Sequence, residues 1–171
     1  MGFLKLVILA LMFTGCSHTT TLYLVRHGEK LPANPNVPPE NVELSPAGHA
    51  RAQALSDSMA ARNLKAIFAT TIRRTQQTVE PTANAKGLMV IQYPATQAAA
   101  NALVDSLVLV KGKSFLVAGH SNTVPAMVRH LGLPCSFSGN IPENDFDNLF
   151  IIKVKKGVKT VQEKTYGAIS P

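Results

Sequence analysis

Tryptophan is absent from this 171-residue chain, all aromatic residues together make up only 6% of it, and it contains only two cysteines. Proteins that hold single-stranded nucleic acid stack the bases on aromatic side chains, so this composition argues against a nucleic-acid partner. Two cysteines are too few for a disulfide framework. The sequence shows no internal repeat or low-complexity tract, and its length and 46% hydrophobic content fit one globular domain.

Acidic residues are also scarce, since 10 Asp and Glu stand against 17 Lys and Arg, which gives a net charge of +7. Part of the basic excess lies near the C-terminus, at Lys153, Lys155, Lys156, Lys159 and Lys164. A positive field of this kind attracts anionic small molecules. The same lysines are equally typical of a strand face that only contacts water, and both interpretations stay open.

No apolar run approaches the length of about 20 residues that a membrane-spanning helix needs. The run from Leu6 to Phe13 follows a single lysine, Lys5, and suits the hydrophobic region of a secretory signal. It ends in Phe-Thr-Gly-Cys-Ser at residues 13–17, which resembles the lipobox of bacterial lipoproteins. The resemblance implies cleavage before Cys16 and lipidation of this cysteine. An ordinary cleaved signal peptide and an uncleaved anchor are the alternatives.

The lipobox divides the chain into a signal peptide, residues 1–15, and a single domain, residues 16–171. It implies a lipoprotein of the cell envelope that is anchored in a membrane, and Ser17 resembles the residue that follows the cysteine in lipoproteins sorted to the outer membrane. An ordinary signal would give a secreted protein instead. With Cys16 lipidated, Cys135 has no intrachain partner, and we expect it to be a small buried hydrophobic residue rather than a reactive thiol.

Two short apolar runs, Leu22–Val25 and Phe115–Ala118, each break into a turn of small residues that carries a histidine. Such runs are typical of buried parallel strands. In open α/β sheets, ligand sites lie just beyond the carboxyl ends of these strands. We therefore expect His27 and His120 to meet at one edge of one sheet.

Strand and helix patterns alternate up to residue 131. This alternation predicts a three-layer α/β/α fold with a mainly parallel sheet, and the glycine in Lys-Lys-Gly at 155–157 marks an antiparallel C-terminal hairpin. The predicted strands are 21–25, 66–69, 88–93, 115–118, 148–154 and 158–163, and the predicted helices are 46–62, 72–81, 96–110 and 124–131.

Local signals set some boundaries of these elements. Ser45 and Pro46 are typical of an N-cap and a first helical position. Thr70 and Thr71 are expected to cap the next helix, and Pro81 is expected to end or kink it. Four prolines between residues 31 and 41 exclude helix and central strand, which predicts a semi-rigid loop at the rim of a site near His27.

Arg26 precedes His27, and Arg74 lies in the first turns after the second strand, so both are expected at the same edge as His120. Arginine offers a fixed fork of N–H donors that matches phosphate oxygens. A neutral imidazole can attack phosphorus and form a covalent intermediate. Phosphoryl transfer mainly needs positioning and positive charge, which two arginines and two histidines supply without a metal or other cofactor.

Four stretches of the sequence resemble the histidine phosphatase superfamily, which includes the phosphoglycerate mutases. Leu-Val-Arg-His-Gly-Glu at 24–29 resembles its signature, and the arginine at residue 74, followed by Gln and Thr at 77 and 78, resembles its second block. Val-Ala-Gly-His-Ser-Asn at 117–122 resembles the third block. Residues 141–150 resemble the C-terminal stretch of small secreted or lipoprotein members. The resemblance implies a phosphoglycerate mutase-like fold.

Carried over to this sequence, the resemblance implies that His27 is the nucleophile that becomes phosphohistidine. It implies that Arg26, Arg74 and His120 bind the transferring phosphoryl group, with the backbone N–H of Ser121 as a further donor. The spacing of the second block selects Arg74, which leaves the preceding residue, Arg73, as a surface charge.

The general acid that protonates the leaving oxygen stays open. Family phosphatases often use a carboxylate between the second and third blocks, where this chain has only two. The candidate carboxylates are Glu29, Glu80, Asp105, Glu143, Asp145 and Asp147.

The sequence thus predicts a metal-independent phosphatase that hydrolyses small phosphomonoesters. Mutase activity fits less well, because the chain lacks the long insertions with which mutases enclose bisphosphates. The alternative is a module of the cell envelope that kept the pocket for binding anions or a partner and lost turnover.

Overall fold

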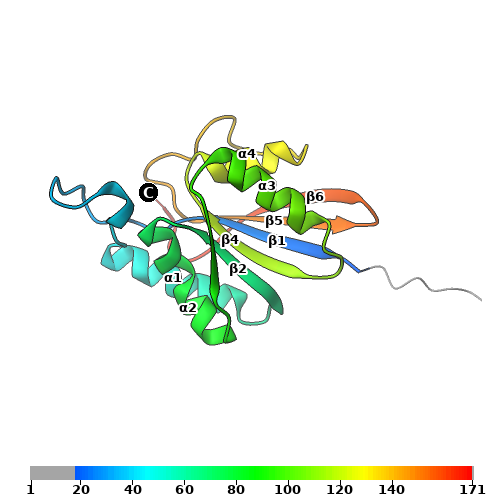
Figure 1. Ribbon diagram of the computed structural model, residues 1–171, viewed down its shortest axis with the longest axis horizontal. Helices are drawn as coiled ribbons and strands as arrows, with labels where there is room; N and C mark the ends of the chain where they lie inside the picture. The colour runs from blue at the N-terminus through cyan, green and yellow to red at the C-terminus, as the bar shows by residue number, and fades with distance from the viewer. Residues whose placement is uncertain (1–17, 171) are drawn as a thin grey trace, which may run out of the picture.

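Residues 18–170 of the computed structural model are described here, and they form one six-stranded sheet in the order β3-β2-β4-β1-β5-β6 (Figure 1). The strands β1 to β4 are parallel to one another, and β5 and β6 form an antiparallel hairpin at one edge. The elements are β1 (Thr20–Arg26), a 3-10 turn (Pro39–Asn41), α1 (Pro46–Met59), β2 (Leu64–Thr70), α2 (Arg73–Lys86), β3 (Val90–Tyr93), α3 (Gln97–Val108), β4 (Ser114–Gly119), α4 (Thr123–His130), β5 (Asn148–Lys155) and β6 (Val158–Thr165).

β1 lies near the middle of the sheet, and all seven of its residues are buried. Its side chains alternate between two hydrophobic cores, as the period of a strand requires. Leu22 and Leu24 belong to the core that α3 and α4 cover, and Tyr23 and Val25 belong to the core that α1 and α2 cover. Figure 1 shows these helix pairs on opposite faces of the sheet. The predicted three-layer fold is confirmed.

Residues 18–170 contain the six-stranded sheet, the helices that cover both of its faces and the two hydrophobic cores between them. The predicted signal peptide and the lipidation of Cys16 lie outside the described residues. Within residues 18–170, no helix is both long enough and apolar enough to cross a membrane.

The start of α1 agrees with the sequence prediction. The side chain of Ser45 accepts a hydrogen bond from the backbone N–H of Gly48, and Pro46 is the first helical residue. The helix begins close to the turn after β1, since a Cβ atom on Gly48 would lie 2.1 Å from the carbonyl oxygen of Glu29. Glycine is therefore required at residue 48, and this contact ties α1 to the turn that carries His27.

The predicted N-cap of α2 is wrong, and the helix does not end at Pro81. Its N-cap is Ile72 rather than Thr70 or Thr71, because the Thr70 hydroxyl lies in a buried hydrogen-bonded group with Thr75. The helix also continues through Pro81 to Lys86. Proline costs the hydrogen bond that its missing N–H would make. The turns beyond it are held by buried side chains and by Gly87, whose left-handed conformation closes the helix.

The carboxyl ends of β1 and β4 lie side by side, since Arg26 pairs with Gly119 and the N–H of His27 donates to the carbonyl of Gly119 at 3.0 Å. The two histidine turns thus leave the sheet at the same end. The proline-rich loop, residues 31–41, projects at this end (Figure 1, left).

Candidate active site

His27 and His120 meet at the carboxyl end of the sheet, as predicted. Their ring centroids lie 5.5 Å apart and the ring planes cross at 67°. His27 is buried and His120 is half-buried. The separation leaves both imidazoles within reach of a single phosphate-sized group.

The tautomer of His27 follows from one backbone contact. Its Nδ1 lies 2.7 Å from the carbonyl oxygen of Gly28. A carbonyl only accepts hydrogen bonds, so Nδ1 carries the proton and Nε2 carries the lone pair. Nε2 accepts a hydrogen bond from Nε of Arg74 at 3.1 Å. The nitrogen of this imidazole that carries the lone pair is thus defined, and it lies next to a positive charge.

Arg74 lies in the first turn of α2 and connects His27 to the proline-rich loop. While its Nε donates to His27, its Nη1 donates to the carbonyl of Pro39 at 2.9 Å. The preceding residue, Arg73, is exposed and pairs with Glu43 at 3.4 Å. The structure therefore brings Arg74 into the histidine cluster and leaves Arg73 on the surface, as the sequence predicts.

His120 is oriented by Thr70, whose hydroxyl lies 3.0 Å from its Nε2. Its backbone N–H donates to the hydroxyl of Thr123 at 3.0 Å. Ser121 follows in the turn before α4, where backbone N–H groups lie at the positive end of the helix dipole. Its carbonyl accepts a hydrogen bond from the N–H of Ile141, which links this turn to the stretch before β5.

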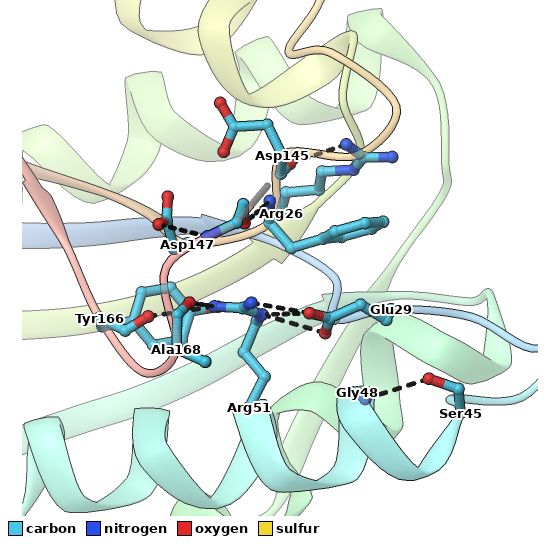
Figure 2. Close-up of polar contacts among 12 residues, drawn as sticks. Arg26, Glu29, Ser45, Gly48, Arg51, Asp145, Asp147, Tyr166 and Ala168 are labelled. Atoms are coloured by element: carbon cyan, nitrogen blue, oxygen red, sulfur yellow. Dashed lines mark hydrogen bonds and ion pairs between the residues drawn. The ribbon is translucent and has the colours of Figure 1, made fainter.

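Arg26 is buried beneath the segment that follows residue 141. Its Nη1 donates to the carbonyls of Pro142 at 2.5 Å and Asp145 at 2.8 Å, and its guanidinium carbon lies 4.1 Å from the ring centroid of Phe146. Figure 2 shows the guanidinium reaching Asp145. Arg26 thus holds this segment over the end of β1 in addition to lying in the cluster. Its Nε is buried and has no hydrogen-bond partner among residues 18–170.

The arginines act on both histidines electrostatically. Burial lowers the pKa of His27 well below 6.5, and the charges of Arg74 and Arg26 lower it further. Burial and the same two charges lower the pKa of His120 from 6.5 to about 4. Both imidazoles are therefore neutral at neutral pH, which is the state that a nucleophile requires.

Glu29 lies two residues after His27 in the sequence, but its side chain contacts Arg51. Arg51 of α1 donates to both of its carboxylate oxygens, through Nε at 3.0 Å and Nη2 at 2.7 Å (Figure 2). Burial alone would raise the pKa of Glu29, but the hydrogen bonds and charge of Arg51 outweigh it and lower that pKa. A carboxylate held ionised in this way is a poor proton donor, so Glu29 is not suited to be the general acid.

The other carboxylates differ in their positions. Asp105 pairs with His130 at 2.9 Å on the helical surface, and Asp147 accepts a hydrogen bond from the N–H of Ser170. Glu80 is exposed on α2. Glu143 lies 3.4 Å from Nη2 of Arg26, and its charge also acts on Arg74. Asp145 accepts a hydrogen bond from Asn148, and burial raises the pKa of its carboxyl. Among these candidates, Glu143 and Asp145 are thus the ones whose charges act on Arg26.

A pocket of about 640 Å³ opens beside the histidine cluster. The proline-rich loop forms most of its wall, and Arg74 and Lys30 supply its cationic side chains. The predicted position of this loop at the rim of the site is confirmed.

Several contacts that shape the site were missed by sequence reasoning. The Gly28 carbonyl and the Thr70 hydroxyl orient the histidines, and Arg51 fixes Glu29. The motifs place Gly28 and Thr70 in the right turns, but the direction of a carbonyl or a hydroxyl depends on the assembled sheet. Arg51 had one usable signal, because a basic residue stands on the buried face of an otherwise predictable helix.

The low pKa values of both histidines predict how stability depends on pH. Between pH 6.5 and about 4 the unfolded chain binds protons on imidazoles that the folded protein keeps neutral. Unfolding then takes up protons, so the free energy of unfolding should fall as the pH drops through this range. Urea denaturation at several pH values measures this. His120→Gln should reduce the fall, the exposed-site control His49→Gln should not, and equal slopes in all three proteins would contradict the assignment.

Arg51 should contribute strongly to stability, because it is buried and its Nη1 also donates to the carbonyls of Tyr166 and Ala168. Arg51→Met leaves Glu29 and both carbonyls without this donor, and we expect a loss of about 3 kcal/mol in the free energy of unfolding. Urea denaturation measures it, with the exposed Arg62→Met as the matched control. A loss within about 0.5 kcal/mol of the control would show that the buried pair contributes little.

Comparison with known proteins agrees with this geometry. A model of the histidine phosphatase superfamily (branch 1) matches residues 22–99. No curated protein sequence matches the chain. One similar solved structure is SixA from Agrobacterium tumefaciens, with a TM-score of 0.64 and 20% identity over 87% of this chain and 98% of that chain. The protein histidine phosphatase SixA in complex with tungstate has a TM-score of 0.67 and 16% identity over 85% of this chain and 96% of that chain. A mycobacterial glucosyl-3-phosphoglycerate phosphatase has a TM-score of 0.64 and 16% identity over 88% of this chain and 100% of that chain.

Residues 22–99 thus resemble the histidine phosphatase superfamily (branch 1), and the similar solved structures share the fold of this chain. The fold of the chain is phosphoglycerate mutase-like. At these identities the solved structures establish the fold, and the substrate has to be argued from the site.

Proposed function

We propose that the protein is a metal-independent phosphatase that hydrolyses phosphomonoesters through a phosphohistidine on His27. The observation that carries the proposal is the state of this imidazole. Nδ1–H is held by the carbonyl of Gly28, and the Nε2 lone pair is buried, neutral and next to Arg74. A neutral nitrogen with a fixed lone pair beside a cationic fork is prepared to attack a phosphate ester.

In the first step, Nε2 of His27 forms a bond to phosphorus as the bond from phosphorus to the ester oxygen breaks. The alcohol leaves with a proton from a general acid or from water. In the second step, a water molecule attacks the phosphohistidine, the P–N bond breaks, and inorganic phosphate leaves while Nε2 regains its lone pair. The protein supplies positioning and positive charge to both steps.

The remaining residues bind the phosphoryl oxygens in this proposal. Arg74 donates from its fork, and Arg26 adds charge and a buried Nε–H that lacks a partner among residues 18–170. His120 and the N–H of Ser121 approach from the β4 side. A bound phosphoryl dianion offsets the charges that lower the pKa of His120, so this imidazole gains a proton and donates to the dianion.

We propose Glu143 as the general acid, since its side chain is 81% exposed beside Arg26 and meets that guanidinium at 3.4 Å, a longer contact than the bonds of 2.7 to 3.0 Å with which Arg51 holds Glu29. Glu143→Gln should then lower kcat by about 10²-fold for alkyl phosphates, whose leaving oxygen needs a proton, and hardly at all for p-nitrophenyl phosphate. Steady-state kinetics on both substrates measures this split. Glu80→Gln is the control on α2. Equal effects of Glu143→Gln on both substrates would exclude the role.

The substrate is proposed to be a small phosphorylated molecule. The similar structures include a protein histidine phosphatase and a glucosyl-3-phosphoglycerate phosphatase, so this fold accommodates different leaving groups in those proteins. In this chain, the pocket between Arg74 and the proline-rich loop is where the leaving group would lie. The sequence of residues 1–17 supports a location in the cell envelope, with the lipid on Cys16 as the anchor.

A p-nitrophenyl phosphate assay of residues 18–171 tests the proposal. We expect turnover that persists in EDTA and is inhibited by tungstate, an oxyanion that binds the SixA structure named above. A protein that binds tungstate without turning over any phosphate ester would be the alternative, an envelope anion-binding module.

A further inference from the structure

The end of the sheet opposite the histidines carries a second charged surface. The chain leaves the sheet here at Thr20, whose hydroxyl donates to the carbonyl of Val110 and accepts from the N–H of Gly112. The side chain of His18 lies against Gly112. The start of the described chain is therefore fixed to the α3–β4 loop at this end, which Figure 1 shows on the right, with the β5–β6 turn beside it.

Several strands begin or end at this end of the sheet, and the residues next to those points include many basic ones. Arg62 precedes β2, Lys113 precedes β4 and also accepts the N–H of Thr21 through its carbonyl, and Lys155 ends β5. The pairing of Thr21 with Lys153 places the end of β5 beside the start of β1. The basic residues of this end surface are Arg62, Lys65, Lys111, Lys113, Lys153, Lys155 and Lys156.

The charges at this end have no acidic partners nearby. The four ion pairs described within residues 18–170 involve Arg26, Arg51, Arg73 and His130, none of which belongs to the end surface. A groove of about 650 Å³ runs across it, lined by Arg62, Lys153 and Lys155 with threonine and apolar residues, and no carboxylate lines this groove. Asp57 lies in the last turn of α1, where it accepts a hydrogen bond from Gln53, and Asp105 pairs with His130.

Large apolar side chains are exposed among these basic residues. Met89 before β3 is 87% exposed, Leu109 after α3 is 77% exposed, and Val158 beside the β5–β6 turn is 65% exposed. Exposed apolar side chains interleaved with lysines suit an interface with lipid, since the cations attract anionic headgroups and the apolar tips enter the headgroup region. A partner that offered only negative charge would leave these apolar side chains exposed to water.

We propose that this end surface docks on a bilayer that contains anionic phospholipid. The surface surrounds the point where residue 18 enters the fold, so docking and an N-terminal lipid anchor would act on the same side of the molecule. β1 has seven residues, which puts the histidine cluster about 23 Å from the bilayer and facing away from it. The docking requires neither lipidation nor phosphatase activity.

Vesicle sedimentation of residues 18–171, which contain the six-stranded sheet and both described cores, tests the proposal without the predicted anchor. The probes are vesicles of phosphatidylcholine with and without phosphatidylglycerol. We expect sedimentation only with the anionic vesicles and a decrease as salt is added. Equal sedimentation with both vesicles, or none with either, would overturn the proposal.

Two sets of variants make the test specific. Lys155→Gln with Lys156→Gln should lower the bound fraction several-fold, whereas Lys30→Gln with Lys164→Gln, which removes the same charge at the other end, should not. Leu109→Gln with Val158→Gln should also weaken binding. If the apolar variants bind like the wild type, the surface is a general anion site for nucleic acid or acidic protein, and bilayer docking is contradicted.

A p-nitrophenyl phosphate assay of the lysine and apolar variants of the end surface distinguishes this proposal from the proposed enzymatic function. These residues lie away from the histidine cluster, so their activity should equal that of the wild type. Vesicle binding without turnover would contradict only the enzymatic proposal, and turnover without vesicle binding would contradict only the docking.

Discussion

Replacing His27 with alanine should reduce phosphatase turnover by about 10⁴-fold or more, because the variant lacks the nitrogen that forms the covalent intermediate. His27 is buried, and its Nε2 lone pair faces Arg74, so no other imidazole of the site occupies the same position. His120 lies 5.5 Å away between ring centroids and is held by Thr70. Steady-state kinetics with p-nitrophenyl phosphate measures the loss.

A binding measurement separates loss of chemistry from loss of fold in the His27→Ala variant. The arginines and His120 remain, so the variant should still bind tungstate in calorimetry and unfold cooperatively in urea. Activity that survives the substitution in a protein that binds tungstate normally would overturn the assignment of His27 as nucleophile.

Arg74→Ala should lower kcat/KM by about 10²–10³-fold, because it removes a preorganised donor from the charge that develops on the phosphoryl oxygens. The effect should reach kcat as well as KM, since Arg74 also contacts the nucleophile through Nε. Arg74→Lys should restore little, because an ammonium group cannot contact Nε2 of His27 and the phosphoryl group with the geometry of a planar fork.

The neighbouring arginine is the matched control for Arg74→Ala. Arg73 lies one residue earlier in α2, is exposed and pairs only with Glu43 at the surface. Arg73→Ala should therefore keep kcat/KM close to that of the wild type. Equal losses for both variants would indicate that α2 contributes general positive charge and not a specific donor.

Much of the fold follows from the sequence because the strands of this sheet are short apolar runs that end in small residues. The runs before His27 and His120 predict two neighbouring parallel strands, and the sheet pairs them directly. The cluster of His27, His120 and Arg74 then follows from the rule that parallel strands present their carboxyl ends at one edge.

Other features depend on contacts between distant residues. Pro81 predicts an end or a kink of α2, but the helix continues to Lys86, with the buried residues Thr82 and Ala83 directly after the proline. The family resemblance implies that Arg26 binds the phosphoryl group, and in the structure its guanidinium binds the carbonyls of Pro142 and Asp145, more than 110 positions away. The sequence motif places this arginine correctly, but local patterns cannot show which carbonyls a buried guanidinium reaches.

Trapping the intermediate tests the central claim most directly. The protein is mixed with p-nitrophenyl phosphate, quenched within the turnover time under conditions that preserve phosphoramidates, digested and analysed by mass spectrometry and phosphorus NMR. The account predicts one phosphoryl group on Nε2 of His27, because Nδ1 is protonated and held by the carbonyl of Gly28. A phosphoryl group on His120 or on Nδ1 of His27, or turnover with no phosphorylated histidine, would contradict it.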